Sequence, residues 1–280
     1  MVEITDQILQ EAENQHYKFQ IGCYFSGSKK IQGALLLWSN KIKDFYWNYA
    51  TKINIDESIL QKLVKNIIDF YKSKNRQPAI YFTPFTTPKN LPALIRKFGF
   101  QSKYQDTWMF YEKAEPKVAM PEKFVIKQVE TKEEMKVFVD IFNQCYGGAT
   151  PEEPYGALPK EYGECLVDSF TQQRGKKIIH YLGLFDKKPV GIATLIFSGD
   201  YGCIYNVGTI PNHRKKGIGS ALTLNAVTDS IKNSAKIVFL QTEQGSFNER
   251  YFTSLGFSTK FVGEGFVLKK AGLCELKITK

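Results

Sequence analysis

The chain has 280 residues, of which 43% are hydrophobic and 24% charged, a composition typical of a globular protein of one or two domains. No run approaches the roughly 20 apolar residues that a membrane-spanning helix requires, and the N-terminus, MVEITDQILQEAENQ, lacks the basic start and apolar run of a signal peptide. The five cysteines are scattered, and none forms a CxxC pair. These features predict a cytoplasmic protein without a membrane partner, a disulfide framework or a metal site.

The net charge of the chain is +10. A basic protein of this kind binds nucleic acid or has a lysine-rich surface and an anionic ligand. The sequence contains no basic helix with interleaved aromatic residues, which a nucleic-acid-binding surface would favour. We therefore expect an anionic ligand and no nucleic acid partner.

The first 115 residues show a regular order of expected elements. Three strand-like runs joined by short turns lie in IGCYFSGSKKIQGALLLWSNKIKDFYWNYATKI, and a helix is expected near Ser58–Lys72. AIYFTPF then predicts a strand, a helix ends at a Gly-Phe pair at Gly99, and TWMFYEK predicts a last strand. A boundary follows at AEPKVAMPE, where prolines with small and charged residues separate two periodic regions.

The second region, residues 122–280, begins with a strand-like run, FVIKQV, and a helix whose start has Thr131 and Glu134 at capping-box spacing. A glycine- and proline-rich loop, CYGGATPEEPYGALP, leads to an expected helix at Lys160–Gln172. Three runs with short turns, KIIHYLGLFD, KPVGIATLIFS and YGCIYNVGTI, predict an antiparallel meander. The remaining expected elements are a helix at Ile218–Ile231, a strand in KIVFLQT, a helix at Ser246–Leu255 and a closing strand in FVGEGFVLKKA.

The two regions repeat one order of elements. GALLLWS parallels GIATLIFS, and Ile80 and Gly99 have the same separation as Ile237 and Gly256. In each region a Gly-Phe pair ends a helix and an apolar strand follows. We therefore predict two domains, residues 1–115 and 122–280, that are copies of one α/β unit, the first lacking its opening strand and helices. Pairing of the copies within one chain favours a monomer.

Residues 213–221, HRKKGIGSA, combine cations, glycines and a helix start. The first N–H groups of a helix have no intrahelical partner and carry a partial positive charge. Glycine lets the preceding backbone approach a ligand without a Cβ in the way. The stretch therefore predicts a site for a multiply charged phosphate ester.

The order VGTIPNHRKKGIGSAL, KIVFLQTE and YFTSLGF resembles the GNAT superfamily of N-acetyltransferases over about residues 123–270. The resemblance implies an α/β (α+β) fold of tandem GNAT-like units, each a mixed, mostly antiparallel sheet flanked by helices. It also implies an acetyl-CoA-dependent transferase that moves an acetyl group to a primary amine of a small molecule or peptide by direct attack on the thioester.

The resemblance assigns two groups of residues to coenzyme A. Backbone groups of Val207, Gly208 and Thr209 are implied to hold the pantetheine and the thioester carbonyl, and Asn248 is a further candidate or a plain surface residue. The residues implied to bind the pyrophosphate are Arg214, Lys215, Lys216, Gly217, Ile218, Gly219 and Ser220.

The sequence departs from the family at its proton donor. The tyrosine that commonly protonates the leaving thiolate stands four residues before the glycine of the Gly-Phe pair, and that position is Phe252 here. Tyr251 is the candidate acid, although one residue on a helix corresponds to a rotation of about 100°. It is equally interpreted as a packed aromatic residue. Glu243, which follows KIVFLQT, is the candidate base; Tyr205 and Asn206 also lie on the last meander strand.

The acceptor site is expected at the CYGGATPEEPYGALP loop. Candidate acceptor-binding residues there are Tyr146, Glu152, Glu153 and Tyr155; the loop is equally interpreted as an ordinary connection. The first copy has no glycine between Gly33 and Gly99, and the region corresponding to the phosphate loop reads KINIDESILQKL. We therefore expect no cofactor in the first copy.

Three alternatives stay open from the sequence. The chain could bind coenzyme A or an acyl form without turnover, an interpretation that Phe252 favours. It could transfer a longer acyl group or an aminoacyl group. The net charge leaves a nucleic-acid-associated protein as the least favoured alternative.

Overall fold

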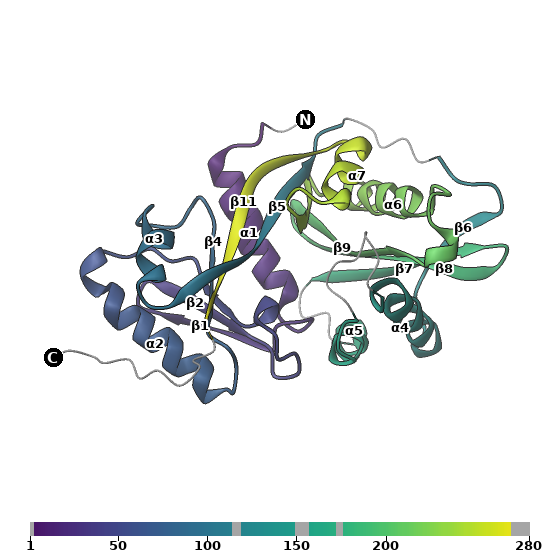
Figure 1. Cartoon of the computed structure of the whole chain (residues 1–280). Coiled ribbons are helices and arrows are strands. Elements are labelled where there is room, and N and C mark those ends of the chain that lie inside the picture. Colours follow the sequence, from purple (N-terminus) through teal and green to yellow (C-terminus); the bar gives the residue numbers. More distant parts are fainter. Residues whose placement is uncertain (1–2, 114–118, 149–156, 172–175, 270–280) are drawn as a thin grey trace. The chain divides into compact units, whose positions relative to one another are not determined.

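The computed structural model describes residues 3–113, 119–148, 157–171 and 176–269 (Figure 1). Within these ranges no helix is long and apolar enough to cross a membrane. In the same part of the chain, His, Cys, Asp and Glu side chains form no cluster of three that could hold a metal ion. None of the four cysteines that the structure describes forms a disulfide; they are Cys23, Cys145, Cys165 and Cys203.

The chain divides into two compact units that do not follow its two halves. One unit combines Met1–Gly27 with Asp106–Val262, and the other combines Ser28–Gln105 with the chain from Gly263 onward. Two long strands, β5 (Phe100–Tyr111) and β11 (Phe257–Leu268), each contribute residues to both units.

The unit around Ser28–Gln105 has strands in the order β1-β2-β3-β4-β11. Strands β2 and β3 are antiparallel, β3 and β4 are parallel, and β4 and β11 are antiparallel. Apolar residues of α2 and α3, among them Ile67 and Ile95, form the core with the sheet. The elements are β1 (Gly27–Ile31), β2 (Ala34–Trp38), β3 (Tyr49–Thr51), α2 (Leu60–Ser73), β4 (Ala79–Phe82) and α3 (Leu91–Arg96).

The larger unit has the strand order β5-β10-β9-β8-β7-β6. Its neighbouring strands are antiparallel except β9 and β10, which are parallel. Its strands are β6 (Phe124–Gln128), β7 (Lys177–Phe185), β8 (Lys188–Ser198), β9 (Tyr201–Thr209) and β10 (Ile237–Glu243). Its helices are α1 (Asp6–Gln20), α4 (Lys132–Tyr146), α5 (Glu161–Thr171), α6 (Ile218–Lys232) and α7 (Phe247–Leu255).

Helices cover both faces of this sheet. Helices α6 and α7 lie on one face and α4 and α5 on the other (Figure 1). The core under α6 includes Leu222, Val227 and Ile204 of β9. Because side chains alternate along a strand, Cys203 and Tyr205 of β9 point to the opposite face. Helix α1 packs there, with His16 against Tyr205.

The predicted fold class is confirmed. Both copies show the order of three strands, helix, strand, helix and strand, and the sheets are mixed and mostly antiparallel. The predicted capping box is also present, because Thr131 accepts from the Glu134 N–H and Glu134 accepts from the Thr131 N–H. These local signals depend on neighbouring residues only.

The last strand of each copy pairs with a strand of the other copy. Strand β5, which ends the first copy, pairs with β10 of the second, with Phe110 opposite Phe239. Strand β11, which ends the second copy, pairs with β4 of the first, with Phe266 opposite Ile80. This exchange, together with α1, explains why the compact units differ from the division into residues 1–115 and 122–280 that the repeat predicts.

Candidate active site

Strands β9 and β10 separate halfway along their length. They pair over only three positions, which end at Phe239 opposite Cys203, and then continue to Glu243 and Thr209. The register between β8 and β9 shifts between Ile192 and Thr194, and Asn206 has a φ of 52°. The resulting bulge turns the end of β9 away from its neighbour. Main-chain groups at such an edge can pair with an extended ligand.

Two carbonyl groups at this edge already have side-chain partners. The Tyr146 hydroxyl donates to the Val207 carbonyl at 2.9 Å, and Arg214 Nε donates to the Thr209 carbonyl at 3.1 Å. A Cβ on Gly208 would lie 2.9 Å from Cys145 of α4. Glycine at position 208 therefore allows α4 to pack directly on the bulge. The predicted backbone site at 207–209 thus has a fixed shape.

Helix α6 follows β9 along the chain, after a short helical turn at Pro211–His213. Gly217, with a φ of 76°, is the N-cap residue, and no side chain caps the helix. The first helical bond runs from the Ala221 N–H to the Gly217 carbonyl at 2.9 Å. The N–H groups of the three intervening residues, Ile218, Gly219 and Ser220, therefore have no partner within the helix. Ile218 is buried and fixes the turn to the core.

The cations beside this turn differ in their surroundings. Lys215 and Lys216 are exposed, and Lys216 Nζ lies 5.4 Å from the centre of the Phe185 ring. Arg214 is half-buried and also donates to the Cys145 carbonyl at 3.4 Å. The two lysines can therefore face a ligand in solvent, while the Arg214 guanidinium holds the end of β9 against α4.

Tyr251 points towards the first turn of α6. A Cβ built on Gly219 would lie 2.9 Å from the Tyr251 hydroxyl oxygen and 3.6 Å from Thr209 Oγ1. The hydroxyl is buried beside the Ser220 and Thr223 side chains of α6, and neither of them reaches it with full hydrogen-bond geometry. Burial raises the pKa of Tyr251 above its ordinary value, so the phenol is protonated at neutral pH. Neighbouring Phe252 is buried in the core against Phe257.

The other predicted residues are more dispersed. Glu243 is half-exposed at the end of β10, opposite Asp106 of β5, and Asn248 is half-buried in the first turn of α7. Tyr146 lies at the β9 bulge through its hydrogen bond to Val207. Glu152, Glu153 and Tyr155 lie outside the described residues. The roles assigned to all these residues remain predictions.

Polar residues of the N-terminal segment contact the same bulge from the opposite face. His16 Nδ1 lies 3.1 Å from the Tyr205 hydroxyl, and the Tyr24 hydroxyl donates to Asn206 Oδ1 at 2.9 Å. Asn206 Nδ2 in turn donates to Thr194 Oγ1 at 3.3 Å. The sequence analysis gave the N-terminal segment no place in the site. The signal for it was the helical spacing of the residues that α1 buries, which include Leu9, Ala12, Glu13, His16, Tyr17 and Gln20.

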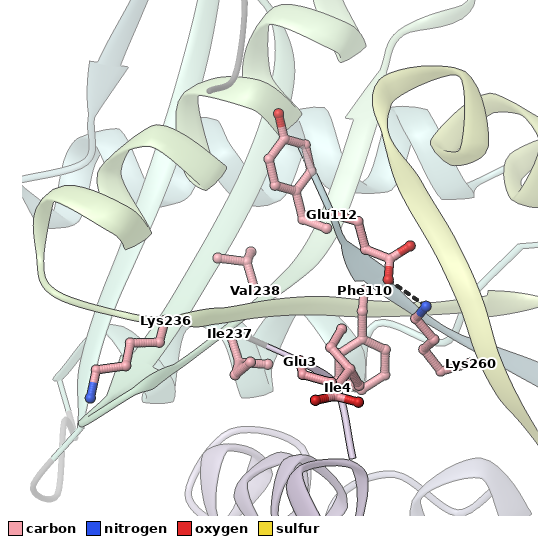
Figure 2. A pocket seen from close by; sticks show the side chains of 9 residues that line it. Glu3, Ile4, Phe110, Glu112, Lys236, Ile237, Val238 and Lys260 are labelled. Atoms are coloured by element: carbon pink, nitrogen blue, oxygen red, sulfur yellow. Dashed lines mark ion pairs between the residues drawn. The ribbon is translucent and has the colours of Figure 1, made fainter. Parts of the chain in front are cut away.

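A cavity of about 640 Å³ lies at the opposite end of β10, near Ile237 (Figure 2). Figure 2 shows the ion pair between Glu112 and Lys260 on its wall. Strands β9 and β10 are still paired at Ile237 and separate only after Phe239. The cavity is therefore distinct from the candidate site at the turn before α6.

Comparisons with known proteins agree with this geometry. Residues 135–257 match the model of the acetyltransferase (GNAT) family. A GCN5-related N-acetyltransferase from Kribbella flavida is 16% identical, with a TM-score of 0.69 over 94% of this chain and 96% of that one. One from Sphaerobacter thermophilus is 13% identical, with a TM-score of 0.62 over 86% and 82%.

A tandem GNAT protein from the clavulanic acid biosynthesis pathway is 11% identical, with a TM-score of 0.62 over 85% of this chain and 79% of that one. At these identities the likeness shows the fold alone. It supports the interpretation of the chain as two GNAT-like copies. Comparison with curated proteins found no match.

Proposed function

We propose, on the premise that residues 135–257 match the acetyltransferase (GNAT) family model, that the protein is an acetyl-CoA-dependent N-acyltransferase that acts on a primary amine. The observation that carries the proposal is the uncapped N-terminus of α6 beside the open edge of β9. This edge can hold an extended chain, and the helix N-terminus can hold a phosphate group at the end of that chain.

The residues at this turn fit the pyrophosphate of coenzyme A. The N–H groups of Ile218, Gly219 and Ser220 are donors without helical partners, and Gly217 leaves them open to a ligand. Lys215 and Lys216 add full positive charge. The Tyr251 hydroxyl lies against the same helical turn, beside Ser220. A ligand at this turn would therefore meet several hydrogen-bond donors and two full positive charges.

Each part of the chain then has a defined task. Bound acetyl-CoA supplies an acetyl group activated as a thioester. The edge at Val207, Gly208 and Thr209 aligns the pantetheine and places N–H donors near the thioester oxygen, where negative charge develops. The Tyr251 phenol, protonated at neutral pH, is the candidate donor to the departing sulfur.

Phe252 favours a second candidate function. Its side chain occupies the position of the usual family acid, is buried in the core and has no proton to donate. A domain with an intact phosphate turn and no acid could bind coenzyme A or an acyl form without turnover. Amine-dependent release of coenzyme A distinguishes the two functions.

The first test is calorimetric titration of acetyl-CoA into the full chain, followed by an assay of coenzyme A release with a set of primary amines. We expect one site per chain, since the first copy lacks a glycine turn, and release that depends on the amine. Binding without release would favour the second candidate function, and absence of binding would contradict both.

Replacing Tyr251 with Phe separates catalysis from packing. The variant loses a buried hydroxyl that makes no well-aligned hydrogen bond to Ser220 or Thr223, so the free energy of unfolding should change by less than about 1 kcal/mol. Turnover should fall at least about tenfold, because a positioned acid contributes roughly 100-fold or more to such reactions. Stopped-flow or steady-state assays of coenzyme A release measure this loss.

Tyr111→Phe is the matched control for this substitution. The Tyr111 hydroxyl is likewise buried, without a partner among the described residues, but it lies at the cavity near Ile237. Its removal should leave turnover unchanged. Equal activity of both variants would show that Tyr251 only packs.

A further inference from the structure

Helix α1 places two buried polar side chains over the separation of β9 and β10. His16 is 3% exposed and Gln20 is 1% exposed, and they lie one helical turn apart. His16 packs edge-on against Trp108 of β5, with ring centres 5.3 Å apart, and approaches Tyr205 of β9 from the same position. Helix α1 therefore bridges the strands on either side of β10.

The Tyr205 hydroxyl connects these two side chains. It lies 3.1 Å from His16 Nδ1, accepts a hydrogen bond from the Gln20 side-chain amide, and also contacts the Cys203 thiol. Burial lowers the pKa of His16 to about 3, so its imidazole is neutral at physiological pH. A neutral imidazole with its hydrogen on Nε2 accepts the Tyr205 proton through Nδ1. The Gln20 amide occupies one lone pair of the Tyr205 oxygen, and the second lone pair is left for another donor.

Gln20 carries a second open acceptor. Its Oε1 atom is buried and has no hydrogen-bond partner in the described part of the chain. A buried oxygen without a donor is costly to the fold and is rare in native proteins. Two uncharged oxygen acceptors, Tyr205 Oη and Gln20 Oε1, thus occur together in one cluster.

The cluster lies close to the edge proposed to hold the thioester. Tyr205 precedes Val207 by two residues on β9. The bulge at Asn206 lies between them, and Tyr24 holds the Asn206 side chain from the segment after α1. The N-terminal segment therefore contacts β9 at the point where the acyl group would react.

We propose that His16, Gln20 and Tyr205 form the subsite that holds the nitrogen of the acceptor amine, an inference that rests on the proposed function. The amine donates one N–H to Tyr205 Oη and a second N–H to Gln20 Oε1. Its lone pair then stays free to attack the thioester carbon. His16 does not contact the amine; it is a positioning residue that fixes the Tyr205 hydroxyl.

This arrangement discriminates between primary and secondary amines. A primary amine has two N–H groups and satisfies both acceptors, whereas an N-methyl amine leaves Gln20 Oε1 without a donor. A site with an unsatisfied buried group rejects the analogue that lacks the donor. We expect kcat/KM to be at least about tenfold higher for a primary amine than for its N-methyl counterpart.

The test uses the full chain with acetyl-CoA and four probes: butylamine, phenethylamine and the N-methyl derivative of each. Gln20→Leu removes the open acceptor at similar side-chain volume and should reduce the preference below about threefold. Tyr205→Phe should raise KM for the primary amine at least about tenfold while the Kd for acetyl-CoA changes less than twofold. Both variants should keep an unfolding temperature close to that of the wild type.

His16 is tested with a conservative pair of variants. His16→Asn presents a side-chain oxygen near the place of Nδ1 and should retain the wild-type KM within about threefold, while His16→Phe should behave like Tyr205→Phe. Tyr17→Phe is the control, because it removes an equally buried hydroxyl of α1, bonded to Glu13, and should leave KM unchanged.

The possible failures are distinct. Unchanged KM and unchanged preference in Gln20→Leu and Tyr205→Phe would overturn the subsite and leave the acyltransferase in place. Acetyl-CoA binding without turnover of any probe would overturn the amine subsite and favour a non-catalytic coenzyme A-binding protein. No binding of acetyl-CoA to the wild type would overturn the proposed function itself.

Discussion

Gly217→Glu is expected to weaken acetyl-CoA binding at least about 100-fold. The substitution places a carboxylate at the positive end of α6, in front of the free N–H groups that the pyrophosphate would use. The φ of 76° at this position adds backbone strain for any side chain. Calorimetric titration at low and moderate salt measures the loss, which should be larger at low salt because charge repulsion is then less screened.

Two variants separate charge from strain. Gly217→Ala has the same backbone strain without the carboxylate, so it should lose much less affinity. Gly199→Glu places the same residue at another glycine of positive φ, 54°, in a turn where a Cβ would meet no neighbour within 4 Å. It should leave binding unchanged. If Gly217→Glu and Gly199→Glu bind acetyl-CoA equally well, the turn before α6 is not the phosphate site.

Lowering the pH from 7 to 5 should reduce the free energy of unfolding by about 4 kcal/mol through two histidines. Burial lowers the pKa of both His16 and His180 to about 3, and each side chain is at most 3% exposed. The unfolded chain, with histidine pKa values near 6.5, binds protons in this range that the folded chain does not. The stabilisation is therefore fully present above about pH 6.5 and is lost as the pH falls towards 3.

Urea unfolding at pH 7, 6 and 5 measures this effect. The carboxyl groups whose pKa values are lowered, such as Glu11 and Glu112, lose their contribution only near and below their unfolded pKa of about 4. The chosen range thus isolates the histidines. His16→Asn should remove about half of the pH dependence. A free energy of unfolding that stays constant from pH 7 to pH 5 would show that water reaches both rings.

Local elements of this fold follow from the sequence. The cap at Thr131, the start of α6 after Gly217 and the end of α7 at Gly256 each depend on a few adjacent residues with a distinctive backbone preference. The order of strands and helices in both copies follows from hydrophobic periodicity for the same reason.

Long-range features could not be predicted in this way. The pairing of β5 with β10 joins residues more than 100 positions apart, and both strands read as ordinary apolar runs. The contact of His16 with Tyr205 is equally remote in sequence. Gly208 beside the bulge at Asn206 is a weak signal, because one glycine in a strand equally fits a close helix contact, and the direction of Tyr251 depends on how α7 packs on α6. These features decide which side chains meet. The site predicted from the sequence therefore did not include the residues of α1.

The exchange of β5 and β11 bears on the origin of the chain. Two identical molecules that traded their final strands would form a domain-swapped dimer, whose assembly depends on protein concentration. Fusion of two such copies makes the partner strand intramolecular and removes that dependence. Each copy then relies on its neighbour for a strand, because loss of either would expose a sheet edge prone to aggregation. Such mutual dependence would retain a copy that lacks a glycine turn, because its strands still pair with those of its neighbour.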